Sequence, residues 1–293
     1  MIENIFSQIL DQKREGIAKF RADLSSRNLR KHALEIRKNA EPHRLLRALV
    51  GTLRCAAQSA QRADPTLKII AELKRRSPSA GIIRADLTVS DVIRCYERAG
   101  ACAISILTDE QYFGGSIADL SAARANTRLP LLRKDFIIDS IQIFEAAIAG
   151  ADAVLLIVAA LDDDSLSELR ALAEDDLGLD AVIEIHTSGE LNRALTAGAK
   201  IIGVNNRDLK TFQVSLTTSE HLIAEAPRDR ILISESGLQN ADALIRLRKL
   251  GFRGFLIGEA LMRATNPETA LRDWIAAGKC QQPEAISTEA CQR

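Results

Sequence analysis

An excess of charge of either sign is missing from this 293-residue sequence, in which 39 Lys and Arg residues balance 39 Asp and Glu residues. Proteins that bind nucleic acids or membrane surfaces through phosphate groups need a basic excess, so the balance argues against both partners. A small phosphorylated ligand is still compatible, because it needs only a local site. No stretch approaches the roughly 20 apolar residues that span a bilayer, and the N-terminus carries no apolar signal core. We therefore expect a cytoplasmic protein.

Cysteine and histidine are also scarce, with five and four residues. The cysteines form no CxxC pair, and no Cys/His cluster has the spacing of a zinc site. No glycine-rich nucleotide fingerprint follows a strand-like run. We expect reduced thiols, no metal and no cofactor. The cysteines are Cys55, Cys95, Cys102, Cys280 and Cys291.

Short apolar runs rich in β-branched residues recur from residue 67 onward, each followed by a helical stretch. Continuous runs, rather than alternating ones, are typical of strands buried on both faces. Gly closes the preceding helix in RAGACAISI, IAGADAVLL, TAGAKIIGV and KLGFRGFLI. The eight runs are Leu67–Leu73, Cys102–Leu107, Leu129–Leu132, Ala153–Val158, Ala181–Ile185, Ile201–Val204, Arg230–Ser234 and Gly254–Ile257. They predict an α/β fold, a single (β/α)8 TIM barrel over residues 66–276, with an open doubly wound sheet as the alternative.

The first 65 residues carry no strand signal and predict a helical extension. Ile5, Ile9 and Ile17 give the first part an apolar side, and a second amphipathic stretch runs from about Pro42 to Arg62. We expect this extension to pack on the barrel over its catalytic face. Residues 277–293 are polar and without periodicity, which is typical of a frayed tail.

Ionisable residues crowd the carboxyl ends of the predicted strands, where barrel enzymes carry their active sites. Glu72 and Lys74 end the first strand and, being two residues apart, point to the same side. Later strands end in Lys134, Glu184, Asn205 and Glu235. Lysines and glutamates that meet in one barrel mouth supply donors and acceptors for acid–base catalysis. For His186, beside the fifth strand, a structural or supporting role is favoured over a place in the mouth.

Two glycine-containing turns, Ser236-Gly237 and Gly258-Glu259, follow the last two strands. In barrels this is where backbone N–H groups commonly bind a phosphate. Phe113 and Phe136 follow the second and third strands, on the opposite side of the mouth. The pattern predicts a substrate with a phosphorylated end and a flat apolar end.

The segments that carry these residues resemble the indole-3-glycerol phosphate synthase family. The matching stretches, in family order, are IIAELKRRSPSAG, SILTDEQYFGGS, LPLLRKDFIIDSIQI, AVLLIVAAL, VIEIH, GVNNRDLKTF, ISESGL and FLIGEALMR. The resemblance implies a lyase that closes 1-(2-carboxyphenylamino)-1-deoxyribulose 5-phosphate into indole-3-glycerol phosphate, with loss of CO2 and water. That reaction serves tryptophan biosynthesis and needs neither metal nor cofactor.

The resemblance also implies a role for each matching side chain. Lys134 is the general acid and Glu184 the general base, while Lys74 serves the charged groups of the substrate or shares the acid role. The lysines would be held by Glu72 and Glu235, and the substrate hydroxyls by Asn205. The carboxylate end of the substrate is assigned to Ser77 and Arg207. The ring pocket is assigned to Phe113, Phe136, Leu155, Leu209 and Leu256. The phosphate is assigned to Ser236, Gly237, Gly258 and the backbone of Glu259.

Two other functions are compatible with a phosphate-binding barrel. One is an isomerase such as phosphoribosylanthranilate isomerase, which typically has a Cys/Asp pair where this sequence has Glu72 and Lys74. The other is a binding subunit without catalysis, against which the presence of both Lys134 and Glu184 argues. The expected partner is a small phosphorylated molecule. We also expect a monomer, weak association with other enzymes of the pathway, and a lid at Lys74–Gly81 that substrate orders.

Overall fold

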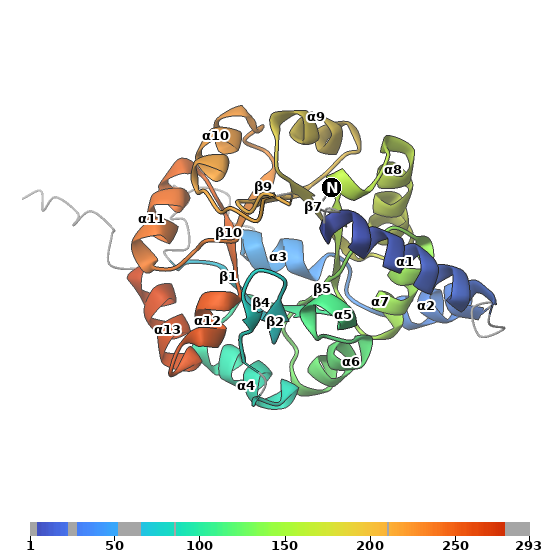
Figure 1. Ribbon diagram of the computed structural model, residues 1–293, viewed down its shortest axis with the longest axis horizontal. Helices are drawn as coiled ribbons and strands as arrows, with labels where there is room; N and C mark the ends of the chain where they lie inside the picture. The colour runs from blue at the N-terminus through green and yellow to red at the C-terminus, as the bar shows by residue number, and fades with distance from the viewer. Residues whose placement is uncertain (1–4, 23–27, 52–65, 85, 210, 279–293) are drawn as a thin grey trace, which may run out of the picture.

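The protein is described by a computed structural model that covers residues 5–22, 28–51, 66–84, 86–209 and 211–278. Eight parallel strands close into one barrel in the order β1-β10-β9-β8-β7-β6-β5-β4 (Figure 1). The strands are β1 (Ile69–Leu73), β4 (Ala103–Leu107), β5 (Leu131–Lys134), β6 (Ala153–Ile157), β7 (Asp180–Ile185), β8 (Ile201–Asn205), β9 (Ile231–Glu235) and β10 (Gly254–Ile257). Each predicted run therefore forms a strand, and the predicted barrel is confirmed over the open sheet.

The strands are continuous apolar runs because both of their faces are covered. One layer of buried side chains fills the barrel interior, among them Ile70, Leu132 and Val182. A second layer, including Ile104 and Ile183, packs between the strands and the outer helices. The register follows from this alternation, since a slip of one residue would exchange the two layers.

The helices that surround the barrel begin and end at the residues that local chemistry favours. They are α4 (Val89–Ala99), α6 (Ile117–Asn126), α7 (Ser140–Ile148), α8 (Asp163–Ala171), α9 (Ser188–Thr196), α10 (Thr217–Glu225), α11 (Ala241–Leu250) and α13 (Pro267–Ala277). Side chains such as Thr88 and Asn240 cap the N-termini. All four glycines expected to close helices take positive φ: Gly100, Gly150, Gly198 and Gly251.

The N-terminal helices take three different positions rather than one. Helix α1 (Ile5–Ala22) lies over the carboxyl ends of the strands, as expected, and brings Phe6 and Ile9 to the mouth. Helix α2 (Leu29–Arg37) instead packs beside α7 on the outside of the barrel. Helix α3 (Arg44–Val50) crosses the middle of the ring of strands (Figure 1).

Helix α3 closes the end of the barrel opposite the mouth. Leu45 and Leu49 enter the interior layer, where Leu49 lies against Gly254 at the start of β10. Arg44 donates to both carboxylate oxygens of Asp152, next to the start of β6, at 2.9 Å. The expectation that the whole extension covers the catalytic face is therefore wrong for α2 and α3. The expected helix from Pro42 to Arg62 is confirmed only as α3, which ends at Val50, and residues 52–65 lie outside the described residues.

The segment after β1 contains a short antiparallel hairpin of β2 (Arg76–Ser77) and β3 (Gly81–Ile82). Its ordering by substrate stays a prediction. Within the described ranges, no helix is both long and apolar enough to cross a membrane. Of the five cysteines, Cys95 and Cys102 are free and half-buried, and the other three lie outside the described residues.

Candidate active site

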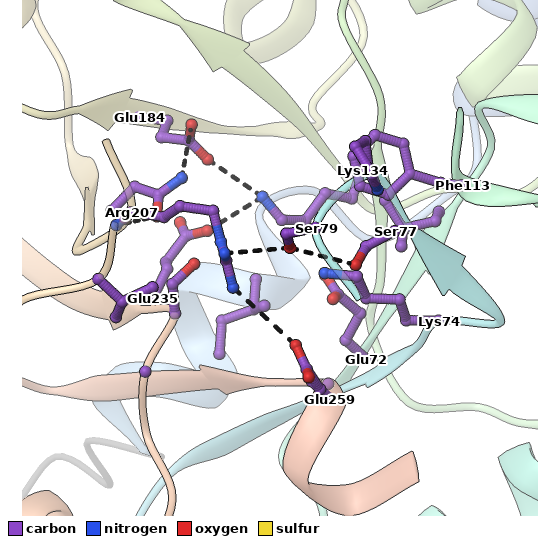
Figure 2. A pocket seen from close by; sticks show the side chains of 18 of the residues that line it. Glu72, Lys74, Ser77, Ser79, Phe113, Lys134, Glu184, Arg207, Glu235 and Glu259 are labelled. Atoms are coloured by element: carbon purple, nitrogen blue, oxygen red, sulfur yellow. Dashed lines mark hydrogen bonds and ion pairs between the residues drawn. The ribbon is translucent and has the colours of Figure 1, made fainter. Parts of the chain in front are cut away.

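A cavity of about 440 Å³ opens at the carboxyl ends of the strands. Its lining contains every residue that the sequence suggested for a substrate site (Figure 2). The acid–base residues come from the ends of β1, β5, β7, β8 and β9. The closed barrel brings these strand ends together, although they are separated by up to 163 residues of chain, from position 72 to position 235.

Lys134 stands between two buried carboxylates. Its Nζ lies 3.0 Å from Oε2 of Glu184 and 3.1 Å from Oε2 of Glu235. Burial opposes the charge of the ammonium group, but Glu184 and Glu235 outweigh it and raise the pKa of Lys134 above its usual range. Lys134 is therefore a protonated donor at neutral pH.

The two carboxylates differ although they share one lysine. Burial tends to raise the pKa of both, but Lys134, His186 and Asn205 together lower the pKa of Glu184. Asn205 contributes a hydrogen bond of 3.1 Å to Oε1 of Glu184. Burial and the charge of Glu184 raise the pKa of Glu235 to about 7. Glu184 is thus the ionised member of the pair, which suits a proton acceptor.

Lys74 has a different environment from Lys134. It is half-buried directly after the end of β1, and its Nζ lies 5.6 Å from the centre of the Phe113 ring. Burial lowers the pKa of Lys74, and the positive charges of Arg207 and Lys134 add to this effect against that of Glu72. Glu72 is buried beside it and accepts a hydrogen bond of 3.4 Å from Ser105. The two lysines are therefore not equivalent as acids.

One wall of the cavity is aromatic. The rings of Phe113 and Phe136 have their centres 6.1 Å apart, and the ring of Phe6 in α1 also lies 6.1 Å from that of Phe136. Leu155, Leu209 and Leu256 complete the apolar surface. Sequence reading placed the N-terminal extension over the catalytic face but did not select Phe6, because the local sequence does not show which side chains of α1 reach the mouth.

The opposite side of the cavity has backbone that only small residues fit. Ser236 and Gly237 both have positive φ, and a Cβ at Gly237 would stand 2.3 Å from the side chain of Val214. A Cβ at Gly258 would stand 2.4 Å from Oε1 of Glu72. Gly258 precedes the short helix α12 (Glu259–Arg263). This close approach of bare backbone is compatible with an anion bound by N–H groups.

The Glu259 side chain is held by arginines. Its carboxylate lies 3.0 Å from Nε of Arg263 and 3.9 Å from Arg207. Arg207 also donates to Oγ of Ser79 at 3.2 Å, and Ser79 lies 3.5 Å from Oγ of Ser77 (Figure 2). Sequence reading did not select Ser79. This chain of contacts links the loop after β8 to the hairpin after β1, so Ser77 and Arg207 face the same part of the cavity.

A buried ionic cluster under α1 was also not selected from the sequence. Lys13 lies 2.9 Å from Asp109 and 2.7 Å from Asp135, which follows Lys134 directly. Burial opposes ionisation of Asp135, but Arg133 and Lys13 lower its pKa to about 2. The only signal in the sequence was a lysine on an otherwise apolar side of α1. The cluster fixes α1, and with it Phe6, above the mouth.

We predict that Lys13→Met both destabilises the protein and weakens substrate binding. Removing one partner of a buried ion pair typically lowers the free energy of unfolding by about 3 kcal/mol. KM should rise more than kcat falls, because α1 supplies a wall of the cavity and no reacting group. Urea denaturation and steady-state kinetics measure the two effects. Lys19→Met, on an exposed position of α1, is the control, and equal effects of the two changes would contradict the prediction.

The described residues contain no group of three or more His, Cys, Asp and Glu side chains that could hold a metal ion. The fold and the cavity define the chain as a (β/α)8-barrel protein with acid–base groups gathered at the carboxyl ends of its strands. Its overall structure is similar to that of 3-hexulose-6-phosphate synthase from Salmonella typhimurium, with a TM-score of 0.58 and 15% identity. That likeness covers 73% of this chain and 99% of the other. At this identity it supports the barrel fold alone.

Sequence comparison identifies the family. The family profile of indole-3-glycerol phosphate synthase matches residues 6–274. The indole-3-glycerol phosphate synthase of Polaromonas sp. is 43% identical over 270 residues, which are 92% of this chain and 97% of the relative. Indole-3-glycerol phosphate synthase 2 of Ralstonia nicotianae is 49% identical over 208 residues, 71% of this chain and 77% of the relative. The chain belongs to the indole-3-glycerol phosphate synthase family, and the resemblance seen in its motifs is confirmed.

Proposed function

We propose that this cavity closes 1-(2-carboxyphenylamino)-1-deoxyribulose 5-phosphate into indole-3-glycerol phosphate, as a carboxy-lyase of tryptophan biosynthesis. The observation that carries the proposal is the position of Lys134. It is a protonated donor, 3.0 Å from an ionised acceptor, inside a cavity with an aromatic wall on one side and bare glycine backbone on the other. The family to which the chain belongs has this activity in its name.

We place the substrate in the cavity in one orientation. Its phosphate lies against Ser236, Gly237, Gly258 and the backbone of Glu259, where N–H groups can bind oxygen. Its carboxyphenyl ring lies between Phe113, Phe136 and the leucines of the wall. Its carboxylate reaches Ser77, Arg207 and Lys74. The ketone, in the middle of the molecule, then lies beside Lys134.

The first chemical step is ring closure. Lys134 donates its proton to the ketone oxygen while the ring carbon that bears the carboxylate attacks the ketone carbon. The new C–C bond interrupts the aromatic ring, and departure of CO2 leaves its bonding electrons behind to restore it. Glu235 and Glu72 keep the charge of Lys134 in place before this step.

The second step is dehydration. The hydroxyl derived from the ketone leaves as water after it is protonated, and Glu184 accepts the proton that the substrate loses. Asn205 holds Oε1 of Glu184 at 3.1 Å and orients the substrate hydroxyls. Because Glu184 and Lys134 are 3.0 Å apart, the proton taken by one can return to the other. Lys134, reprotonated from solvent after ring closure, is the first candidate for protonating the leaving hydroxyl, and Lys74, with its lowered pKa, is the second.

The test is the appearance of indole fluorescence when the purified chain meets the carboxyphenylamino substrate. A binding subunit would take up the substrate without producing indole, and an isomerase would leave the carboxylate on the ring. CO2 release in the same reaction separates both alternatives from the proposed lyase.

We expect activity to persist after exhaustive dialysis against EDTA, because every proposed step uses side chains of the chain itself. Turnover before and after dialysis, with and without added Mg²⁺ or Zn²⁺, is the measurement. A loss on chelation that one of these ions restores would show that a metal takes part.

The Gly237→Asp variant tests the phosphate position. We expect a large rise in KM, since the new carboxylate repels the phosphate and its Cβ would stand 2.3 Å from Val214. Gly237→Ala shares the steric strain without the charge, so the difference between the two variants measures the electrostatic part. Unchanged KM in both variants would place the phosphate elsewhere.

The expected partners follow from the same proposal. The ligand is a small phosphorylated molecule, and a monomer suffices because one chain supplies all of the residues proposed for the site. Weak association with other enzymes of the pathway and a cytoplasmic location stay predictions.

A further inference from the structure

His186 lies directly behind Glu184 and takes no part in the steps above. It follows the last residue of β7, its side chain is 12% exposed, and it is not among the residues that line the cavity. A titratable ring buried beside the proposed base affects the charge of that base.

Glu190, in the first turn of α9, determines the orientation of the ring. Its Oε2 accepts the backbone N–H of His186 at 2.6 Å and lies 3.2 Å from Nδ1 of the same residue. A carboxylate oxygen only accepts hydrogen bonds, so Nδ1 carries a hydrogen. The ring is therefore tethered through Nδ1, and its other nitrogen points away from α9.

The other nitrogen faces the proposed base. Nε2 lies 3.6 Å from Oε1 of Glu184 and has no hydrogen-bond partner among the described residues, although it is buried. Oε2 of Glu184, by contrast, accepts from Lys134. One carboxylate oxygen of Glu184 thus faces Lys134, and the other faces His186.

The charges around His186 favour its imidazolium form. Glu184 from β7, Glu190 from α9 and Glu235 from β9 all act on the ring. Lys134 and Asn205 both contact Glu184, the carboxylate that faces the ring. Burial opposes the charge, but the hydrogen bond to Glu190 and the charge of Glu184 outweigh it and raise the pKa of His186.

In the proposed reaction, Glu184 must stay ionised after Lys134 has given up its proton, and a second cation beside Glu184 would favour this. Lys134 and Glu184 are in direct contact, so a proton that moved between them would neutralise acid and base together. Once Lys134 has protonated the substrate, Glu184 also loses its main counterion inside a buried site. Without another positive charge, its pKa would rise and it would take a proton from elsewhere.

We propose that His186, tethered by Glu190, is a positioning residue that keeps Glu184 ionised and oriented through the cycle. This inference rests on the proposed role of Glu184 as the base. In this arrangement Glu190 orients His186, and His186 in turn keeps Glu184 charged.

The first test follows the histidine signals of the ¹⁵N-histidine-labelled enzyme by NMR as a function of pH. We expect His186 to titrate above its ordinary value of about 6.5. Glu184→Gln and Glu190→Gln should each lower that value by about one unit or more, as loss of a carboxylate within about 4–6 Å does. His221 is the internal control, because it pairs with Glu225 at 3.3 Å with the same spacing but is 70% exposed.

The second test is the pH profile of kcat/KM for His186→Gln. Loss of the positive neighbour raises the pKa of Glu184, so the base is protonated at higher pH. The acidic limb should move upward by about one pH unit, which is roughly a 10-fold loss of activity below the limb. His221→Gln should leave the profile unchanged.

These two experiments test the role of His186 independently of the proposed reaction. If His186 titrates at its ordinary value, or ignores Glu184→Gln, the proposal is wrong even in a fully active enzyme. An unshifted acidic limb in a folded His186→Gln enzyme would also overturn it, because a purely structural histidine changes stability and not the limb. If His186→Gln does not fold, the NMR titration and Glu190→Gln still decide the question. An active Glu184→Gln enzyme would instead refute the proposed base.

Discussion

Replacing Lys134 with Met should lower kcat by about 100- to 10,000-fold, the usual contribution of a general acid. Methionine has a similar length but carries no proton to donate. Binding should persist, because the aromatic wall and the glycine backbone of the phosphate side do not depend on Lys134. Steady-state kinetics gives kcat and KM, and calorimetric titration with indole-3-glycerol phosphate measures binding without turnover.

Lys74→Met is the matched control for this prediction. Both lysines are half-buried in the same cavity, but burial lowers the pKa of Lys74, whereas two carboxylates raise the pKa of Lys134. We expect Lys74→Met to affect KM at least as strongly as kcat. If Lys134→Met instead kept a near-normal kcat and only weakened binding, Lys134 would be a substrate anchor. Lys74 would then become the leading candidate for the acid.

Replacing Glu184 with Gln should produce a loss of similar size, about 100- to 10,000-fold in kcat, for a different reason. The amide keeps the shape of the side chain and can still accept a hydrogen bond, but it does not take up a proton. Ring closure and decarboxylation precede the step that needs the base. In a single turnover, we therefore expect CO2 to appear faster than indole fluorescence.

Glu235→Gln is the matched control for Glu184→Gln. Both carboxylates are 1% exposed and both contact Lys134 at about 3 Å. The pKa of Glu235 is raised to about 7, so this residue is already partly neutral near pH 7, and its replacement should cost much less activity. Larger loss in Glu235→Gln than in Glu184→Gln would exchange the roles of the two residues. Equal slowing of CO2 and indole formation in Glu184→Gln would place its role in the first step.

The residues of the candidate site could be selected from the sequence because, in a barrel, the end of each apolar run marks a position at the mouth. Lys134 and Glu184 each end an apolar run, and in a parallel barrel all such ends lie on one face. The spacing of Glu72 and Lys74 by two residues gives both the same direction. The residues that were not selected lack such a pattern. Lys13 and Phe6 belong to a helix whose place over the mouth depends on contacts more than 90 residues away in sequence, such as that with Asp109.

For the N-terminal extension, the local sequence pattern predicts helices but not where on the barrel each helix packs. An amphipathic helix shows which of its faces is buried, but not which surface buries it. Leu45 and Leu49 close the bottom of the barrel because Asp152 and Asp180, at the starts of β6 and β7, bind Arg44, His43 and the backbone of Leu46. The partners are 108 to 137 residues apart in the chain. Nothing near Arg44 indicates them.

The sequence by itself determined the strands, the glycine-ended helices and the ionisable groups at the strand ends, because each depends on neighbours within one strand–helix unit. The tertiary structure decided for a closed barrel over an open sheet, because closure depends on the pairing of β1 with β10, which are far apart in the chain. Only the tertiary structure decided which cation meets which carboxylate. Lys134 rather than Lys74 lies between Glu184 and Glu235, and His186 stands behind Glu184 instead of in the cavity. Glu184 and Glu235 raise the pKa of Lys134 against the effect of burial, whereas burial lowers the pKa of Lys74. The physical reason is that charge and burial act through space, over distances that chain position does not record.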